Sequence, residues 1–223
     1  MEETDLGRVM EALQSYKYTM VRFDPAHQET ALWLKSMGFT FLDRYLCMEI
    51  PIQKTKASRQ LLSGGPSLGV TLTDDYGKDM EELAIEVYTT DRRFHLGERY
   101  DRGVAGEMIH AYLAVFQEER CPVVKLLDSY GSLLGFTILR KRSDVLWENV
   151  MGVTMQGIKG KLAAYCLYNG MLDTILTLSS EPRKARYMGM VSSENTASLN
   201  LHIGLGAIVS RSVEEYIFRS EAK

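Results

Sequence analysis

The chain has 223 residues, of which 45% are hydrophobic, so it can bury a substantial core in one large domain or two small ones. Lys and Arg number 26 against 29 Asp and Glu, and the net charge of -3 excludes the basic excess typical of nucleic-acid binders. The three cysteines are too widely spaced for a disulfide framework or a zinc site, and no apolar leader or membrane-spanning run occurs, so we expect a cytoplasmic protein.

Residues 1–60 predict an N-terminal half-domain of the order strand, helix, strand. The segments "YTMVRF" and "FTFLDRYLCMEIPI" have strand character, and "AHQETALWLKSM" between them has helical periodicity. Gly38 fits a left-handed cap at the end of this helix, and Pro25 fits an early helical position. A stretch rich in Ser and Gly follows, and it predicts a linker at residues 61–77.

Residues 78–223 predict a second and larger domain. Two helices, "GKDMEELAIEVYTT" and "DRGVAGEMIHAYLAVFQEE", precede three strands, "CPVVKLLD", "LLGFTILRK" and "VLWENVMGV". The turn "SYGS" joins the first two strands, as an antiparallel meander requires. A long helix over about residues 160–178, the strand "ARYMGMVS", a short helix and the strand "SVEEYIF" complete the chain.

The short helix lies in "NTASLNLHIGLGA" and is predicted to begin at about Thr196. A turn of about 100° per residue places Asn195, Ser198 and His202 on one polar stripe. Apolar residues flank this stripe, with Ala197, Leu201 and Leu205 on one side and Leu199 and Ile203 on the other. We therefore expect the His202 side chain to be half-buried between the two flanks.

The order of these elements resembles the GCN5-related N-acetyltransferase family, an α/β fold whose mixed sheet is flanked by helices. The family pattern of Asn, an aromatic residue seven positions later and Gly four positions further is similar to Asn195, His202 and Gly206 in this chain. The segment "NVMGVTMQGIKGKLAAYCL" is similar to the family's strand and acetyl-CoA loop. A partial half-domain ahead of the full domain is similar in order to the dTDP-fucosamine acetyltransferase type.

The resemblance implies a cofactor site for acetyl-CoA at the turn before the long helix. Gly157 and Gly160 would let the backbone and the helix N-terminus approach the pyrophosphate, and Lys159 and Lys161 would add positive charge. The loop departs from the family pattern, because Lys159 stands where a count from Gln156 requires Gly. An ordinary strand-to-helix turn with solvated lysines is the alternative interpretation. The other cofactor-binding candidates are Met151, Val153 and Asn195.

Two residues are candidates for catalysis of acyl transfer. The resemblance places the oxyanion donor, a backbone N–H of the fourth strand, near residues 150–153, and it makes His202 the proton donor to the departing thiolate where the family usually has Tyr. Glu148 on the same strand would accept the amine proton and could raise the pKa of His202. Alternatively, Glu148 is a solvent-facing strand residue, and His202 merely hydrogen-bonds Ser198 or a backbone carbonyl. Asp144 is a weaker candidate base.

The sequence thus predicts an N-acetyltransferase that uses acetyl-CoA to acetylate a small-molecule amine, with a nucleotide-linked amino sugar as the first candidate. The alternatives are a peptide or protein amine acetyltransferase and a non-catalytic CoA-binding module. We expect no metal site, because the histidines His27, His95 and His110 are scattered. We expect no nucleic-acid or membrane partner. The sequence is compatible with a homodimer and does not decide the oligomeric state. The tyrosines Tyr165 and Tyr168 of the long helix are interpreted as core packing.

Overall fold

The computed structural model describes residues 18–55, 68–90, 102–155 and 158–219. Its contacts divide the chain into two units, with Met1–Cys47 and Ser210–Lys223 in unit 1 and Met48–Val209 in unit 2. The sequence placed the boundary after residue 60 instead, followed by a linker at 61–77. Residues 48–52 belong to unit 2 because Ile50 and Ile52 are fully buried in its core. The end of the chain belongs to unit 1 because the last strand pairs with the first.

The described residues of unit 1 form three strands and one helix. It contains β1 (Tyr18–Phe23), α2 (Gln28–Ser36) and most of β2 (Thr40–Pro51) and β8 (Ile208–Arg219). β1 pairs antiparallel with β8, and Leu34 of α2 packs in a small core with Phe39 and Tyr216. The strand, helix, strand order of residues 18–51 is therefore as predicted.

Gly38 ends α2 in the way the sequence indicates. Its φ is 86°, its N–H donates to the Lys35 carbonyl (3.1 Å), and the N–H of Phe39 donates to the Leu34 carbonyl (3.0 Å). These two bonds form a Schellman cap, which requires a residue in the left-handed region. The start of the helix differs from the prediction. Pro25 precedes the helix, which begins at Gln28.

Unit 2 carries the remaining regular elements and a mixed sheet. Its hydrogen-bonded strands follow the order β7-β6-β5-β4-β3, antiparallel from β3 to β6 and parallel between β6 and β7. This confirms the predicted α/β class with a mixed sheet. The elements are β3 (Gly69–Thr73), α4 (Lys78–Thr90), α6 (Arg102–Glu118), β4 (Val123–Leu127), β5 (Leu133–Lys141), β6 (Leu146–Thr154), α7 (Ile158–Leu178), β7 (Arg186–Ser192) and α8 (Thr196–Gly204), with short 3-10 helices at Ile52–Thr55 and Pro182–Lys184.

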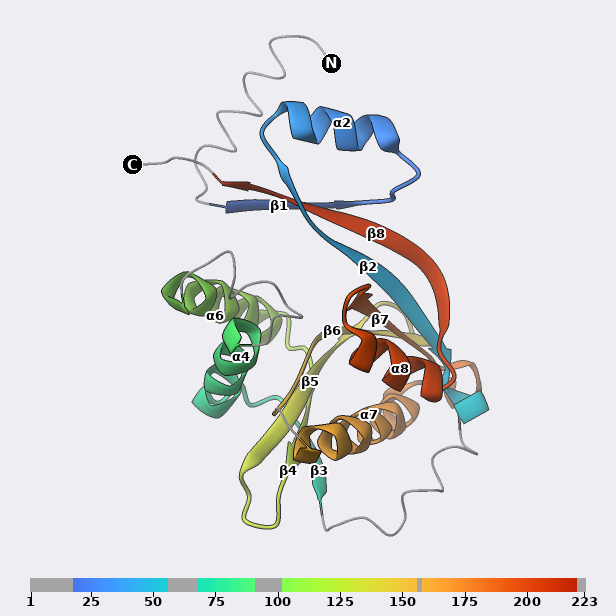
Figure 1. The fold of residues 1–223 in the computed structure, drawn as a ribbon. Coiled ribbons are helices and arrows are strands. Elements are labelled where there is room, and N and C mark those ends of the chain that lie inside the picture. Colours follow the sequence, from blue (N-terminus) through green and yellow to red (C-terminus); the bar gives the residue numbers. More distant parts are fainter. Residues whose placement is uncertain (1–17, 56–67, 91–101, 156–157, 220–223) are drawn as a thin grey trace. The chain divides into compact units, whose positions relative to one another are not determined.

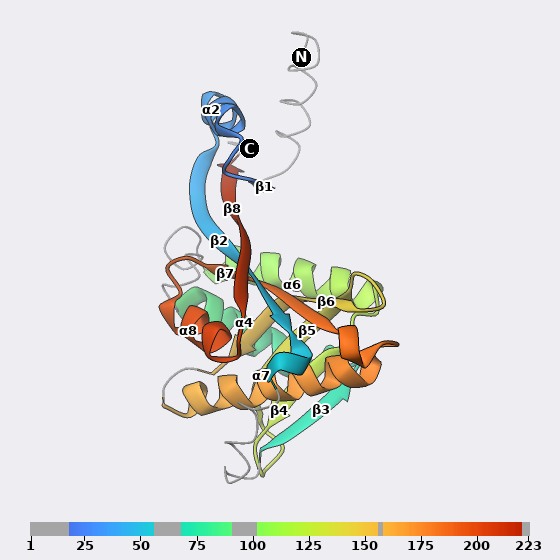
Figure 2. The same cartoon turned by 90° about the vertical axis from the view of Figure 1, so that its right-hand side faces the viewer.

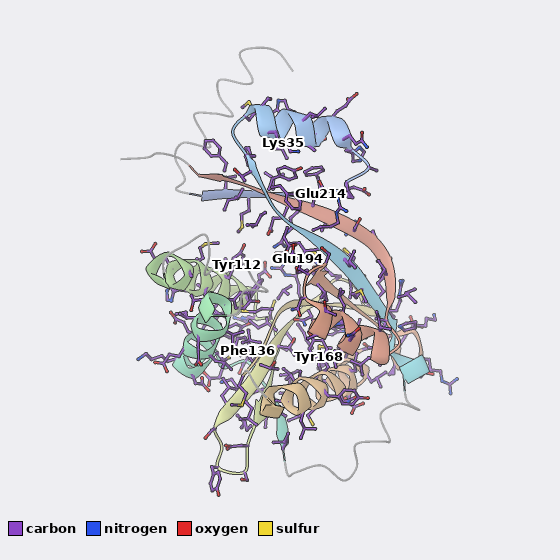
Figure 3. All side chains as sticks on the ribbon, in the orientation of Figure 1. Lys35, Tyr112, Phe136, Tyr168, Glu194 and Glu214 are labelled. Carbon is purple, nitrogen blue, oxygen red and sulfur yellow. The ribbon has the colours of Figure 1, made fainter. Side chains whose placement is uncertain are left out.

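Helices cover both faces of the sheet in unit 2 (Figure 1). α4 and α6 cover one face, where Met80, Ile109 and Phe136 form a core cluster. α7 lies on the other face, where Leu167 and Leu172 pack against strand residues, and α8 lies beside it. Figure 3 labels Phe136 and Tyr168, which lie on these two faces. α7 thus packs against the sheet and, through Tyr168 and His202, against α8.

Strand β3 lies inside the region predicted as a linker, which corrects that part of the prediction. It pairs antiparallel with β4 and forms one edge of the sheet in unit 2 (Figure 2). The strand has five residues, and the apolar Val70 and Leu72 remain 38% and 48% exposed. A short strand without a clear buried face carries little periodic signal, so the flanking Ser and Gly residues dominated the interpretation.

Candidate active site

The parallel strands β6 and β7 separate halfway along their length. Their pairing runs from Leu146 opposite Arg186 to Asn149 opposite Gly189 and then stops. β6 nevertheless continues to Thr154, and α7 begins at Ile158. Residues 150–154 thus have no β7 partner in the described ladder, so their backbone groups on that side are left for other partners.

The predicted cofactor-binding residues lie around this separation. The side chains of Met151 and Val153 are buried in the cluster under α4 and α6, so these residues can offer only backbone groups to a ligand. Lys159, Gly160 and Lys161 lie in the first turn of α7. Gly157 lies outside the described residues, as do the side chains of the two lysines. The first turn of a helix leaves backbone N–H groups without intrahelical partners, as anion binding requires.

Asn195 caps helix α8, which begins at Thr196 as predicted. The Asn195 Oδ1 accepts the N–H of Ser198 (3.1 Å). At the other end Gly206 has a φ of 84°, its N–H donates to the Ile203 carbonyl, and the N–H of Ala207 donates to the His202 carbonyl (both 2.9 Å). The spacing of Asn195 and Gly206 therefore delimits a nine-residue helix with a cap at each end.

His202 is fully buried, not half-buried as the sequence predicted. The flank that contains Leu205 is buried at that residue, as expected. On the other flank Ile203 is 60% exposed, so the expectation that this side also packs is wrong there. The stripe itself is confirmed, since His202 Nδ1 lies 2.8 Å from the Ser198 carbonyl oxygen and 3.4 Å from Ser198 Oγ. On the other side of the ring, Nε2 lies 2.9 Å from the Tyr187 hydroxyl.

These contacts fix the tautomer of the His202 ring. A carbonyl oxygen only accepts hydrogen bonds, so Nδ1 must carry the proton that binds the Ser198 carbonyl. In the neutral ring Nε2 then has a lone pair, which accepts the Tyr187 O–H. Burial lowers the pKa of His202, and the Ser198 carbonyl offsets part of this effect. Glu148 is not among the groups that shift this pKa, so it does not supply the rise that a protonated His202 would need near pH 7.

Two tyrosines enclose the His202 ring. Tyr168 of α7 packs edge-on against it with ring centroids 4.9 Å apart, and Tyr187 of β7 lies at 5.7 Å. The rings of Tyr168 and Tyr187 pack edge-on with their centroids 6.3 Å apart, and Asn149 Nδ2 donates to the Tyr168 hydroxyl (3.2 Å). Burial raises the pKa of Tyr168 to about 12 and that of Tyr187 well above its ordinary value. We call Asn149, Tyr168, Tyr187 and His202 the polar cluster.

Two glycines make room for the polar cluster where the strands separate. A Cβ on Gly152 of β6 would lie 2.9 Å from Asn149 Nδ2 and 3.2 Å from the Tyr168 hydroxyl. A Cβ on Gly189 of β7 would overlap the Tyr187 hydroxyl. Glycine inside a strand often marks a close approach of other groups. The sequence interpretation missed the cluster, and these two glycines were the signal that could have revealed it.

Glu148 is buried and engaged in an ion pair. Its Oε2 accepts from Arg142 Nε (2.6 Å) and Nη2 (2.5 Å), so the carboxylate is not the solvent-facing group of the alternative interpretation. It lies close enough to Tyr187 to contribute to the raised pKa of that hydroxyl. Asp144 pairs with Lys141 at 2.7 Å, and this contact lowers the pKa of the Asp144 carboxyl. The structure thus brings Glu148, but not Asp144, next to the polar cluster.

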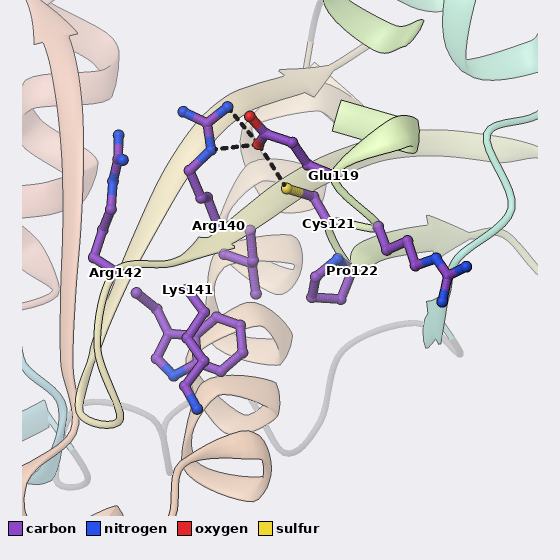
Figure 4. Close-up of a pocket in the computed structure, with 9 residues that line it drawn as sticks. Glu119, Cys121, Pro122, Arg140, Lys141 and Arg142 are labelled. Carbon is purple, nitrogen blue, oxygen red and sulfur yellow. Dashed lines mark hydrogen bonds and ion pairs between the residues drawn. The ribbon is translucent and has the colours of Figure 1, made fainter. Parts of the chain in front are cut away.

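A pocket of about 530 Å³ lies elsewhere in unit 2, at the end of the β5–β6 hairpin (Figure 4). Arg140 binds Glu119 through Nε (2.7 Å) and Nη2 (2.6 Å), and Cys121 Sγ lies 3.6 Å from the same carboxylate. None of the predicted site residues lines this pocket, and two of its arginines, Arg140 and Arg142, pair with the carboxylates of Glu119 and Glu148. Its lining residues are Glu119, Arg120, Cys121, Pro122, Leu139, Arg140, Lys141, Arg142 and Trp147.

Three further features concern only the part of the chain that the structure describes. Cys47, Cys121 and Cys166 are free thiols. No group of three His, Cys, Asp or Glu side chains within the described ranges is arranged to hold a metal ion. Among the helices of those ranges, none is long and apolar enough to cross a membrane.

No protein-family model matches the sequence, and the curated proteins contain no match either. Solved structures do match. A functionally unknown conserved protein from Staphylococcus epidermidis superposes with a TM-score of 0.61 at 12% identity, over 98% of this chain and 79% of that one. A tandem GNAT protein from the clavulanic acid biosynthesis pathway gives 0.60 at 12% identity, over 98% and 71%. A GCN5-related N-acetyltransferase from Sphaerobacter thermophilus gives 0.50 at 11%, over 97% and 65%.

The chain has the fold of the GCN5-related N-acetyltransferases (GNAT). At 11–12% identity the likeness shows the fold alone, and it does not single out the dTDP-fucosamine type. Counted from β3, the fourth strand of this fold is β6. The resemblance placed the oxyanion donor on that strand near residues 150–153, which are the residues that lack a β7 partner.

Proposed function

We propose that the protein is an N-acetyltransferase that moves the acetyl group of acetyl-CoA to the amine of a small molecule. The separation of β6 from β7 after Asn149, directly before the N-terminus of α7, is the observation that carries this proposal. It combines unpaired strand backbone with a helix N-terminus. The two features suit the two ends of the cofactor, which are a thioester carbonyl and a pyrophosphate.

Different residues of the chain would stabilise the oxyanion and bind the pyrophosphate. The backbone of residues 150–154, including Met151 and Val153, would donate to the thioester oxygen as it gains negative charge. The first turn of α7, with Gly157 and Gly160 before and within it, would bind the pyrophosphate, and Lys159 and Lys161 would add electrostatic attraction. Asn195 would act indirectly, because its observed contact caps α8 and thereby holds His202 in place.

The acceptor is proposed to be a small-molecule amine, and a nucleotide-linked amino sugar is the first to test. A peptide or protein amine is the alternative acceptor. Direct attack is the expected route, because an acyl-cysteine route needs an activated thiolate. Burial instead raises the pKa of both Cys121 and Cys166, which disfavours the thiolate form.

Binding and turnover of acetyl-CoA test the proposal. We expect isothermal titration calorimetry of the full chain to detect acetyl-CoA, and Gly157→Val to weaken binding at least about tenfold, since a bulky side chain would block the backbone from the pyrophosphate. CoA release would then be followed with a panel of amino sugars, nucleotide-linked amino sugars and peptides. Binding without turnover on any amine would favour the non-catalytic CoA-binding module. No binding, or no effect of Gly157→Val, would contradict the proposed cofactor site.

A further inference from the structure

The pocket of Figure 4 lies at the opposite end of β6 from the proposed acetyl-CoA site. Trp147 of the pocket is the second residue of β6, whereas residues 150–154 end the strand. At about 3.3 Å per residue, Trp147 and Val153 lie roughly 20 Å apart along the strand. A pocket of about 530 Å³ has the size of a small-molecule site. The acetyl transfer proposed above does not use this pocket.

Strand β5 extends past β4 and has a free backbone edge at the pocket. The Leu139 N–H donates to the Pro122 carbonyl (2.9 Å), but Pro122 has no N–H with which to return a bond to the Leu139 carbonyl. Lys141 lies beyond the last β4–β5 pair. Its backbone faces the same side as that of Leu139, because the next N–H, that of Arg142, donates across to Leu146 of β6. The edge therefore offers the N–H of Lys141 and the carbonyls of Leu139 and Lys141 to a ligand.

Carboxylates hold Arg140 and Arg142 in place and leave part of each guanidinium available. Glu119 accepts from Nε and Nη2 of Arg140, and Glu148 accepts from Nε and Nη2 of Arg142. These pairs do not use the Nη1 group of either arginine. The two arginines are two residues apart on β5 and project from the same face of the strand, as Figure 4 shows. A guanidinium that is already held loses little side-chain freedom when it binds an anion.

The charged side chains of the pocket and their partners have an excess of one cation. The cationic side chains are those of Arg120, Arg140, Lys141 and Arg142, and the paired carboxylates are those of Glu119, Asp144 and Glu148. Arg120 is exposed and makes no ion pair within the part of the chain that the structure describes. The side chains of Lys141 and Asp144 are 49% and 72% exposed, so their ion pair is weak and a bound anion can replace it.

We propose that this pocket binds a small phosphate ester that carries hydroxyl groups, such as a sugar phosphate. The Nη1 groups of Arg140 and Arg142 would donate to the phosphate, and Arg120 and Lys141 would add electrostatic attraction. The carbonyls of Leu139 and Lys141 only accept hydrogen bonds, so they would bind the hydroxyl groups of the ligand.

The size of the pocket favours an ester over either of its parts. A free phosphate ion would occupy only the cationic portion of a space of about 530 Å³. An uncharged sugar would bind the carbonyl edge and leave the free guanidinium groups without an acceptor. The apolar side chains of Pro122 and Trp147, which also line the pocket, would contact the carbon skeleton of the ligand. The site is independent of the proposed acetyl transfer.

Tryptophan fluorescence can report binding because Trp147 lines the pocket. The chain has two tryptophans, so Trp33→Phe leaves Trp147 as the only one. The probes are glucose 6-phosphate, ribose 5-phosphate and glycerol 3-phosphate. We expect at least one of them to bind with a Kd of about 1 mM or lower, at least about tenfold tighter than inorganic phosphate or its own unphosphorylated parent. Calorimetry of the wild-type protein repeats the measurement without any substitution.

Charge substitutions in the pocket should change the affinity in opposite directions. Lys141→Gln and Arg120→Gln should each raise the Kd about threefold to tenfold, because each removes a cation beside the bound phosphate. Glu119→Gln should lower the Kd by a similar factor, because it removes the carboxylate that competes with the phosphate for Arg140. Lys35→Gln, on the exposed surface of α2 in unit 1, is the matched control. It removes the same charge and should leave the Kd unchanged.

A competition experiment distinguishes this pocket from the turn before α7. Saturating acetyl-CoA should leave the Kd of the sugar phosphate unchanged, and competition between the two would place the phosphate at the cofactor site instead. The proposal is overturned if none of the three esters binds at about 10 mM, a concentration that detects even weak sites. Equal affinities for inorganic phosphate and the esters would indicate an adventitious ion only. Equal Kd values in Lys141→Gln, Arg120→Gln, Glu119→Gln and the wild type would show that the ester binds elsewhere.

Discussion

Tyr187 of β7 and His202 of α8 are joined by a buried hydrogen bond of 2.9 Å between the phenol oxygen and Nε2. This contact joins strand β7 to helix α8. It also completes the pairing of the His202 ring, whose Nδ1 is engaged by the Ser198 carbonyl. A fully buried imidazole with both nitrogens paired is stable only in the neutral form that these partners select.

The burial of His202 predicts how stability depends on pH. Its pKa is lowered in the folded state, so the folded protein binds fewer protons than the unfolded chain once the pH falls below the ordinary value of 6.5. The stabilising effect of the neutral ring is therefore complete above about pH 6.5 and is lost as the pH falls toward the folded pKa. Urea unfolding of the wild-type protein at pH 7.5, 6.5 and 5.5 should show a falling free energy of unfolding.

A matched substitution isolates the contribution of this residue. His202→Gln keeps an amide near the position of the ring but cannot titrate, so it should remove part of the loss between pH 6.5 and 5.5. The control is His110→Gln, because the His110 side chain is 71% exposed and contacts only Glu81 at 3.3 Å among the ion pairs described. If both variants keep the wild-type slope, the pH dependence comes from other groups.

The close contact between Gly189 and the Tyr187 side chain predicts that a larger residue at position 189 destabilises the protein. A Cβ there would overlap the hydroxyl of Tyr187, whose ring is fully buried and has no room to withdraw. We expect Gly189→Ala to lower the free energy of unfolding by about 1–3 kcal/mol, the usual cost of overpacking. Gly204→Ala is the control, because an added Cβ meets nothing within 4 Å and alanine favours the helix. Equal stability of the two variants in urea would contradict the tight packing around Tyr187.

Local signals account for the parts of the fold that the sequence predicted. The Gly38 cap, the strand pattern before it and the helix that begins at Thr196 all depend on residues close in sequence. The polar stripe of Asn195, Ser198 and His202 was predicted from helical spacing alone, and each contact along it is observed. Periodicity and caps are properties of a short window, so they need no knowledge of the tertiary structure.

The polar cluster could not be predicted in the same way. Tyr168 resembles an ordinary packing residue of an apolar helix, and Tyr187 an ordinary residue of a strand. Their relation to His202 depends on how α7, β7 and α8 meet, which no local pattern contains. The depth of His202 was missed for the same reason, because α8 is covered by Tyr168 from α7 as well as by the sheet.

The hydrogen bond by which Asn195 caps α8 predicts a small loss of stability when the side-chain oxygen is removed. Asn195→Ala removes the oxygen that accepts the Ser198 N–H, so it should lower the free energy of unfolding by about 1 kcal/mol, within the range of 0.5–2 measured for such caps. Asn195→Ser retains an oxygen acceptor and should recover most of the loss. Because His202 lies on the same helix, its NMR signals should broaden in Asn195→Ala and not in Asn195→Ser. An alanine variant as stable as the wild type would show that the cap contributes nothing.

The end of α6 has a further cap of the Schellman type, in which an arginine takes the left-handed position. Arg120 has a φ of 54°, its N–H donates to the Gln117 carbonyl (3.0 Å), and the N–H of Cys121 donates to the Phe116 carbonyl (2.9 Å). These bonds match those at Gly38 and Gly206, but a side chain in the left-handed region costs about 1–2 kcal/mol that glycine avoids. Replacing Arg120 by Gly removes this cost, but glycine also has more conformational freedom in the unfolded chain, which offsets part of the gain. Arg120→Gly should therefore raise the free energy of unfolding by about 0.5–1 kcal/mol. Arg120→Ala, which keeps a Cβ in the same backbone conformation and removes the same charge, is the control and should give no gain. Equal stability of the two variants would mean that the backbone conformation at Arg120 carries no strain.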